Sequence, residues 1–251
     1  MLVVGNWKMN TRHGEAVRLA ADAVRETADL EGRVDLGVCP PFVWMDAVAE
    51  RLRGTHVALG AQNVAGVASG AHTGEVSAPM LSELGCRYAI VGHSERRAMY
   101  GETDAGVAAR ARAAMDAGLV PIVCVGETLE ERKAGRAESV VEEQLTGSLE
   151  GLTVASGGDL VVAYEPVWAI GTGETATPEQ AQAMHAHIRA RLRGQLGEAG
   201  AAVPILYGGS VKPGNAAELF AQPDLDGGLV GGASLEAGSF AAIARAAAEA
   251  S

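Results

Sequence analysis

Short apolar runs alternate along the chain with longer segments of helical composition. The runs are rich in Val, Ile and Leu and cover residues 2–7, 34–39, 57–62, 88–92, 120–125, 160–164, 203–207 and 227–230. They are continuously apolar and do not alternate with polar residues, which is typical of parallel strands covered on both faces. The pattern therefore predicts eight parallel strands, each joined to the next by a helix.

Capping residues indicate where some of these helices begin and end. The clearest helical segments span residues 14–28, 104–117, 130–149 and 178–196. Thr128 stands just before two glutamates, and Thr177 before Pro178, so both threonines predict helix starts. Glycine just after a helical run predicts its end, as at Gly118, Gly151 and Gly197.

The number of strands decides between two architectures. Eight strand–helix units in 251 residues predict an α/β fold of the closed (β/α)8 barrel type, because an open doubly wound sheet usually has fewer strands. No Gly-x-Gly-x-x-Gly motif follows the first run, which removes the main support for a dinucleotide-binding fold. No linker or low-complexity stretch divides the chain, so residues 1–251 are predicted to form a single domain.

Composition narrows the class of protein. Apolar residues make up 48% of the chain and charged residues 20%, which favours a compact globular protein. The net charge of −11 argues against nucleic-acid binding but leaves room for a small anionic substrate held by backbone amides. There is no signal peptide, membrane-spanning run or pair of close cysteines, so we expect a cytoplasmic protein without membrane contact. Metal-ligand clusters are also missing, and we expect neither a metal nor a cofactor.

Unusual polar residues follow five of the eight runs. In a barrel of this kind, the loops at the carboxyl ends of the strands form the active site. Asn6 lies at the end of the first run and Lys8 follows it, and His93, Glu165 and Ser210 follow the fourth, sixth and seventh runs. Gly231 and Gly232 follow the eighth run. All of these residues are expected at one mouth of the barrel.

Glycine-rich turns at the last strand ends suggest a phosphate site. Glycine lets the backbone approach an anion closely, and the N–H groups at a helix start supply donors. A single Gly-Gly pair predicts only a tight turn. Two such turns at neighbouring strand ends favour phosphate binding, for which the candidates are Gly171, Ser210, Gly231 and Gly232.

Glu165 is the candidate base. A glutamate in a loop is ordinarily a solvated surface residue. This one directly follows a buried run, and the segment after it is typical of a loop that closes over an active site as a lid. The lid comprises Pro166, Val167, Trp168, Ala169, Ile170, Gly171, Thr172 and Gly173. A lid that closes over a carboxylate excludes water and raises its basicity.

His93 and Lys8 are the other candidates for chemistry. A single histidine is more often structural, and this interpretation is kept for His13, His56, His185 and His187. His93 differs because it stands at a strand end, with Lys8 at another strand end. Lys8 could be an ordinary surface lysine, but a fixed cation there would stabilise developing negative charge.

Together these segments resemble the triosephosphate isomerase family from Val3 to Ala247. The resemblance is carried by the Gly5-Asn6-Trp7-Lys8-Met9-Asn10 opening, the His93–Arg97 segment, the Glu165–Gly173 lid and the Tyr207–Val211 turn. It implies interconversion of dihydroxyacetone phosphate and D-glyceraldehyde 3-phosphate through an enediolate, without a cofactor. The family is itself the standard example of acid–base tuning and of a closing loop, so the residue roles are implied by the resemblance.

By this resemblance, Glu165 moves the proton between C1 and C2, and His93 polarises the carbonyl as a neutral imidazole. Lys8 and Asn6 orient the substrate and stabilise the enediolate, with Ser94 and Glu95 in support. Backbone N–H groups of Gly171, Ser210, Gly231 and Gly232 hold the phosphate, and the lid, from Pro166 to about Ala176, excludes water.

The resemblance also implies a homodimer. A long loop from Gln62 to Glu75 would reach the partner subunit, with Thr73 near its Asn6 and Lys8 region and Glu75 paired with the partner's Arg96. We expect this loop to expose Val64 and Val67, which a partner would cover. Two positions depart from the family pattern. His72 stands where Phe or Tyr is usual, and Glu174, after the lid, stands where Lys is frequent.

Two rival functions remain at this point. Another phosphate-binding barrel, such as a pentose-phosphate epimerase or a tryptophan-pathway isomerase, is the nearest enzyme, but such epimerases need metal ligands at the strand ends. A catalytically silent scaffold barrel would be expected to have lost Glu165, His93 or Lys8, and all three are present.

Overall fold

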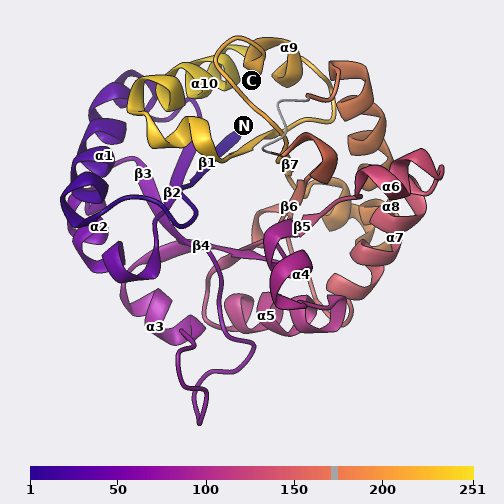
Figure 1. Ribbon diagram of the computed structural model, residues 1–251, viewed down its shortest axis with the longest axis horizontal. Coiled ribbons are helices and arrows are strands. Elements are labelled where there is room, and N and C mark those ends of the chain that lie inside the picture. Colours follow the sequence, from indigo (N-terminus) through magenta and orange to yellow (C-terminus); the bar gives the residue numbers. More distant parts are fainter. Residues whose placement is uncertain (171–174) are drawn as a thin grey trace.

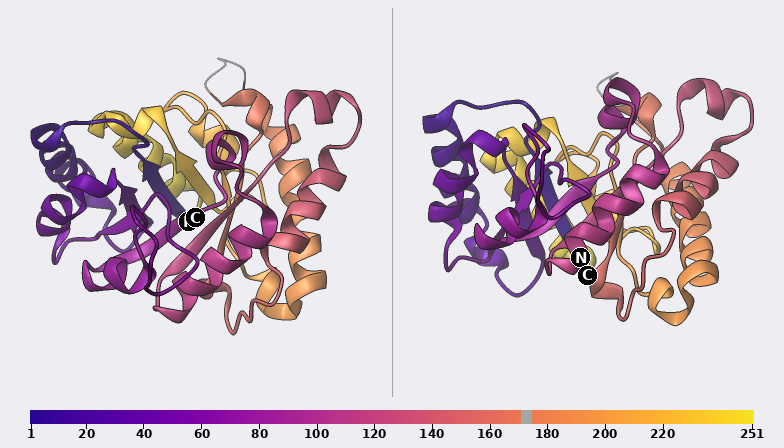
Figure 2. Two further views of the ribbon diagram at one scale, coloured as in Figure 1. Left: turned by 60° about the horizontal axis from the view of Figure 1, so that its bottom comes forward. Right: turned by 90° about the horizontal axis from the view of Figure 1, so that it is seen from below.

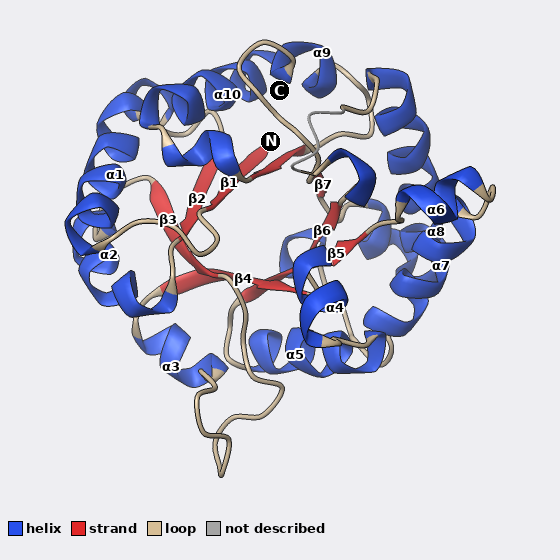
Figure 3. Ribbon diagram, in the orientation of Figure 1, coloured by secondary structure: helices blue, strands red, loops and turns tan. Residues whose placement is uncertain are grey.

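Eight parallel strands form a closed ring at the centre of the computed structural model, which describes residues 1–170 and 175–251 (Figures 1 and 3). The strands are β1 (Leu2–Asn6), β2 (Asp35–Cys39), β3 (Val57–Ala61), β4 (Cys86–Val91), β5 (Val120–Val125), β6 (Val161–Tyr164), β7 (Ile205–Tyr207) and β8 (Gly227–Val230). Strand β1 pairs in parallel with both β2 and β8, which closes the ring. The predicted (β/α)8 barrel is confirmed.

Helices surround the ring of strands on its outer side (Figure 3). They are α1 (His13–Glu26), α2 (Met45–Leu52), α3 (Ala78–Glu83), α4 (Ser94–Tyr100), α5 (Asp104–Asp116), α6 (Leu129–Lys133), α7 (Ala137–Ser148), α8 (Pro178–Ala201), α9 (Ala216–Phe220) and α10 (Ala237–Ala250). Short 3-10 turns include η4 (Val167–Ala169) and η5 (Gly232–Leu235). Within the described ranges, every helix is too short or too polar to cross a membrane.

Two helix starts follow the predicted capping, but one predicted helix is wrong. The side chains of Thr128 and Thr177 each accept a hydrogen bond from a backbone N–H in the first turn of α6 and α8. The single helix expected over 130–149 is divided into α6 and α7. Gly135 lies between them with φ of +70°, and this left-handed conformation interrupts the right-handed helix.

The strands are almost entirely apolar because each has two buried faces. The exceptions away from the carboxyl ends are Asp35 and Arg87, which are exposed near the amino ends of β2 and β4. Leu2 and Val4 point into the barrel, whereas Val3 between them packs against the surrounding helices. The barrel interior is filled by residues from alternate positions of several strands, among them Tyr88, Ile90, Ile122, Cys124, Leu206 and Leu229. Between the amino-terminal positions of Asp35 and Arg87 and the carboxyl ends, the strands have no charged side chain.

The loop between β3 and α3 projects from the barrel wall (Figure 1). Its base is closed by a hydrogen bond from the Ala65 N–H to the Val76 carbonyl, at 2.8 Å. Val67 is 42% exposed, but Val64 is only 1% exposed, so the expected exposure of Val64 is wrong. Val64 lies close enough to the strand end to join the core. The two chain ends lie together elsewhere on the molecule (Figure 2).

Candidate active site

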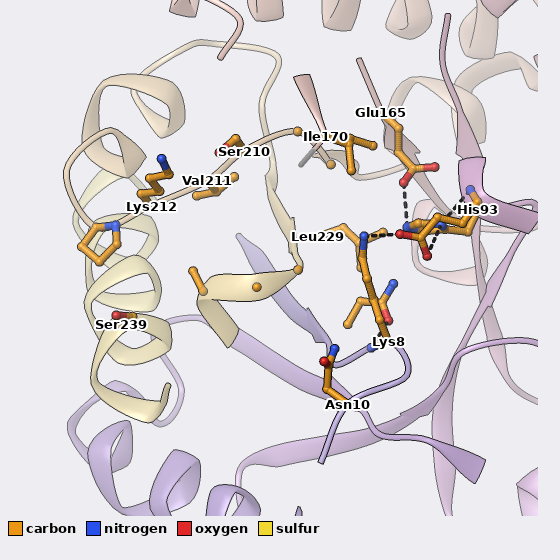
Figure 4. Close-up of a pocket in the computed structure, with 18 residues that line it drawn as sticks. Lys8, Asn10, His93, Glu165, Ile170, Ser210, Val211, Lys212, Leu229 and Ser239 are labelled. Carbon is orange, nitrogen blue, oxygen red and sulfur yellow. Dashed lines mark hydrogen bonds and ion pairs between the residues drawn. The ribbon is translucent and has the colours of Figure 1, made fainter. Parts of the chain in front are cut away.

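A cavity of about 660 Å³ opens at the carboxyl ends of the strands. It brings together predicted residues from five strand ends, namely Asn6, Lys8, His93, Glu165, Ser210, Gly231 and Gly232. Figure 4 shows Glu165, His93 and Lys8 on one side, and Ser210 with Val211 and Lys212 on the other. The predicted residues Gly171, Thr172 and Gly173 lie outside the described residues, as does Glu174.

Lys8 has a strained backbone that aims its side chain at this cavity. Its φ is +52°, a conformation that costs a non-glycine residue about 1–3 kcal/mol. Two side chains hold it: the Lys8 N–H donates to Asn6 Oδ1 at 3.0 Å, and Gln62 Nε2 donates to the Lys8 carbonyl at 2.8 Å. The Lys8 ammonium lies 2.5 Å from Glu95 Oε1. Lys8 is therefore held at its backbone by Asn6 and Gln62 and at its ammonium group by Glu95.

His93 is placed by the turn that precedes it. Gly92 has φ of +67°, and a Cβ atom there would lie 2.7 Å from Val107 Cγ2, so only glycine fits. His93 Nδ1 accepts a hydrogen bond from the backbone N–H of Glu95 at 3.2 Å. In the neutral ring the proton therefore resides on Nε2, which faces the cavity.

Glu165 follows β6 directly and is 1% exposed. Its Oε2 accepts a hydrogen bond from the Ser94 N–H at 2.8 Å, and its Oε1 lies 2.8 Å from His93 Nε2. Gly208 leaves room for this side chain, since a Cβ atom there would lie 2.9 Å from Glu165 Cγ. The sequence-predicted base and electrophile are thus in direct contact.

This contact sets the protonation of the pair. Burial is the largest single influence on the pKa of Glu165 and raises it, but the charge and hydrogen bond of His93, the Ser94 N–H and the charge of Lys8 together outweigh burial and lower the pKa. Burial is also the largest single influence on the pKa of His93 and lowers it, but the charge and hydrogen bond of Glu165, together with the charge of Glu95, outweigh burial and raise the pKa. The expected rise in the basicity of Glu165 is therefore not found while the two side chains touch. Their attraction, and not their burial, decides the outcome.

The far end of the cavity is lined by glycine backbone. Gly231 directly follows β8, and Gly232 begins the 3-10 turn η5. A Cβ atom on Gly232 would meet nothing within 4 Å, and one on Gly231 would meet the Lys8 side chain at 3.4 Å. The Lys8 side chain therefore lies between the glycine backbone of β8 and η5 and the part of the cavity that contains His93 and Glu165. No cluster of potential metal ligands occurs among residues 1–170 and 175–251.

The same order of residues is found in known proteins. The family model described as triosephosphate isomerase matches residues 1–247. The chain belongs to the triosephosphate isomerase family. Triosephosphate isomerase of Halorhodospira halophila is 57% identical over 99% of this chain and 98% of its own, and that of Symbiobacterium thermophilum is 55% identical over 99% and 97%. The crystal structure of triosephosphate isomerase from Bartonella henselae is 40% identical, with a TM-score of 0.89 over 98% of both chains.

Sequence reasoning missed Glu127, a buried carboxylate beside the predicted lid of this family member. Glu127 Oε1 accepts hydrogen bonds from Trp168 Nε1 at 2.8 Å, from Tyr164 Oη at 3.1 Å and from Arg132 Nη1 at 3.1 Å. The Arg132 guanidinium also lies over the Trp168 ring, 4.8 Å from its centroid. Glu127 follows Gly126 just after β5. Its place two residues after the fifth apolar run is the sequence signal that marks Glu127, as the place of Glu165 after the sixth run marks that residue.

His185 has the structural role predicted for it. It is fully buried in α8, and its Nδ1 lies 3.2 Å from the Asp224 carbonyl. Burial lowers its pKa to about 3, so the folded chain keeps the ring neutral where an unfolded chain would protonate it.

This buried ring predicts a loss of stability in acid. Because its pKa is depressed in the folded state, stability is complete above the unfolded pKa near 6.5 and falls as the pH drops toward 3. At pH 4.5 the expected contribution is a loss of roughly 2–3 kcal/mol. Urea unfolding at pH 7.5 and 4.5, at one chain concentration, measures it. Between these two pH values, the free energy of unfolding of His185→Asn should fall by roughly 2–3 kcal/mol less than that of the parent protein. An equal fall in both proteins contradicts the prediction.

Proposed function

We propose that this chain catalyses the reversible interconversion of dihydroxyacetone phosphate and D-glyceraldehyde 3-phosphate by proton transfer through an enediolate. The observation that carries the proposal is the convergence of Glu165, His93 and Lys8 on one cavity from three different strand ends. Membership of the family supports the same activity. Proton transfer beside a carbonyl calls for a base, an electrophile and a fixed cation, and these three side chains supply them.

In the proposed reaction, Glu165 takes the proton from C1 and returns it at C2, while the His93 Nε2–H polarises the carbonyl oxygens. A substrate that enters between the two side chains separates them. The charge attraction that lowers the pKa of Glu165 and raises that of His93 is then weakened, and burial acts in the opposite direction on both. Glu165 becomes the stronger base and His93 the neutral electrophile, as the reaction requires.

The other residues bind and orient the substrate. Lys8 and Asn6 stabilise the enediolate, Glu95 holds the Lys8 ammonium, and the Ser94 N–H holds Glu165 at the edge of the cavity. The backbone N–H groups of four residues would bind the phosphate: Gly171, Ser210, Gly231 and Gly232. The lid from Pro166 to about Ala176 would close over the enediolate and exclude water.

An assay of the purified chain on D-glyceraldehyde 3-phosphate, coupled to reduction of the ketose product, tests this function. The assay is run with and without EDTA. Turnover that EDTA does not change is the expected result. Turnover abolished by EDTA contradicts the metal-free reaction proposed here, and no turnover of either triose phosphate leaves the epimerase and the scaffold barrel as the remaining candidates.

We also propose that the chain is a single-domain cytoplasmic protein that forms a homodimer. Most of its exposed large apolar side chains belong to the first hundred residues: Met9, Phe42, Val43, Val67, Met80, Met99 and Tyr100. A partner that receives the projecting loop would cover such a surface. In the proposed dimer, Thr73 lies near the Asn6 and Lys8 region of the partner subunit, and Glu75 forms an ion pair with the partner's Arg96. Within one chain, Arg96 Nε donates to Glu102 at 2.6 Å.

A further inference from the structure

Lys212 lies at the edge of the cavity on the side away from the proposed base. It belongs to the loop between β7 and α9, and Figure 4 shows it beside Ser210 and Val211, across the cavity from His93 and Glu165. Asn215 fixes the backbone of this loop: its Oδ1 accepts from the Lys212 N–H at 2.8 Å, and its Nδ2 donates to the Ser210 carbonyl at 3.0 Å. The base of the lysine side chain is therefore held beside the predicted phosphate ligand Ser210.

The ammonium group of Lys212 has no partner within the described part of the chain. Its side chain is exposed, and it makes no hydrogen bond or ion pair with residues 1–170 or 175–251. The other lysine of the cavity, Lys8, is 2.5 Å from Glu95, so its charge is largely balanced. His93 lies 2.8 Å from Glu165, so Lys212 is the one basic side chain without an acidic partner among the described residues that line the cavity.

The charges of the cavity explain why a second cation matters. Lys8 and Glu95 balance each other, and Glu165 leaves one negative charge on the side where the proton is transferred. A phosphorylated triose carries close to two negative charges, and it must approach a chain whose net charge is −11. A cation at the opposite side of the mouth gives the cavity a positive end and a negative end, which attracts the phosphate and orients the carbon skeleton toward Glu165.

We propose that Lys212 is a substrate-binding residue. Its ammonium group attracts the phosphate group of the substrate and binds the side of the phosphate that faces away from Glu165. The inference rests on the proposed function and adds a group that selects phosphorylated substrates. The phosphate is unchanged during proton transfer, so Lys212 stabilises the bound substrate and the transition state equally. Its contribution falls on KM and on the rate of binding, and kcat stays nearly constant.

Charge removal at this position, compared with the same change elsewhere, tests the inference. The chain has three lysines, Lys8, Lys133 and Lys212. Lys133 is exposed at the end of α6 and does not line the cavity, so Lys133→Met is the matched control for Lys212→Met. At low ionic strength, Lys212→Met is expected to raise KM for D-glyceraldehyde 3-phosphate about three- to tenfold, with kcat within about twofold. Lys212→Arg should keep the parental KM.

Two further readouts distinguish the inference from its alternatives. Inorganic phosphate should bind Lys212→Met more weakly by a similar factor, measured by calorimetry, and added salt should reduce the difference from the parent protein. Unchanged KM and unchanged phosphate affinity in Lys212→Met, or equal losses in Lys133→Met, overturn the role of Lys212. A parent protein that binds phosphate but converts neither triose phosphate contradicts the proposed function instead, and the calorimetric comparison of the variants still decides the role of Lys212.

Discussion

Replacing Glu165 by glutamine is expected to lower kcat by about 10²–10⁴-fold, because a positioned general base contributes about that factor. The substitution keeps the size and shape of the side chain and removes only its ability to take a proton. The Ser94 N–H, which donates to Glu165 Oε2 at 2.8 Å, can donate equally to an amide oxygen. KM is therefore expected to change much less than kcat. The coupled triose phosphate assay gives both values.

Glu198→Gln is the matched control for this experiment, because Glu198 is an exposed glutamate of α8 that does not line the cavity. It should retain parental kcat. Circular dichroism of both variants checks that the barrel is intact. A folded Glu165→Gln protein that is as fast as the parent would show that another group removes the proton.

Replacing Gly126 by alanine is expected to be the most disruptive single methyl addition near the site. A Cβ atom at this position would lie 1.7 Å from the Glu165 carbonyl oxygen and 2.6 Å from the carbonyl carbon. These atoms are backbone, and no side-chain rotation relieves the overlap. The peptide that carries Glu165 must therefore move. A displacement of about 1 Å at a catalytic group costs on the order of 10²-fold in rate, and such overpacking costs about 1–3 kcal/mol of stability.

Hydrogen bonds around Gly126 prevent its backbone from moving away from Glu165. Its N–H donates to Gln144 Oε1 at 2.8 Å, and its carbonyl accepts from Gln144 Nε2 at 3.1 Å. The Glu165 N–H donates to the Val125 carbonyl at 2.8 Å. Both sides of the close contact are thus hydrogen-bonded in place. We expect kcat to fall about 10²-fold or more and the free energy of unfolding to fall by roughly 3 kcal/mol.

Gly194→Ala provides the comparison for Gly126→Ala. Gly194 lies in α8, and a Cβ atom there would meet nothing within 4 Å. Alanine at this site should leave kcat unchanged and add up to about 1 kcal/mol of stability, as expected in a helix interior. Kinetics and urea unfolding of both variants measure the contrast. Parental kcat and stability in Gly126→Ala would mean that β5 and β6 can separate without moving Glu165.

The candidate site shows which parts of a function can be predicted from local pattern. Glu165 and His93 are predictable from the sequence because a charged or titratable residue directly after a buried run has few structural explanations. Glu127 satisfies the same rule, yet its importance depends on contacts with Tyr164, Trp168 and Arg132 that come from separate segments. Lys212 follows its strand by several residues, and only the course of the loop brings it to the cavity.

The sequence by itself determined the fold class, because continuous apolar runs alternating with capped helices are compatible with few architectures other than a closed parallel barrel. It also determined the family, because several distinctive segments occur in order at the expected spacings. The structure showed the division of the predicted helix at Gly135, which depends on a single backbone angle. Tertiary structure alone decided the burial of Val64 and the directions of the pKa shifts of Glu165 and His93, because these depend on distances between atoms far apart in the chain. Charge interaction and packing vary steeply with such distances, and residue order does not specify them.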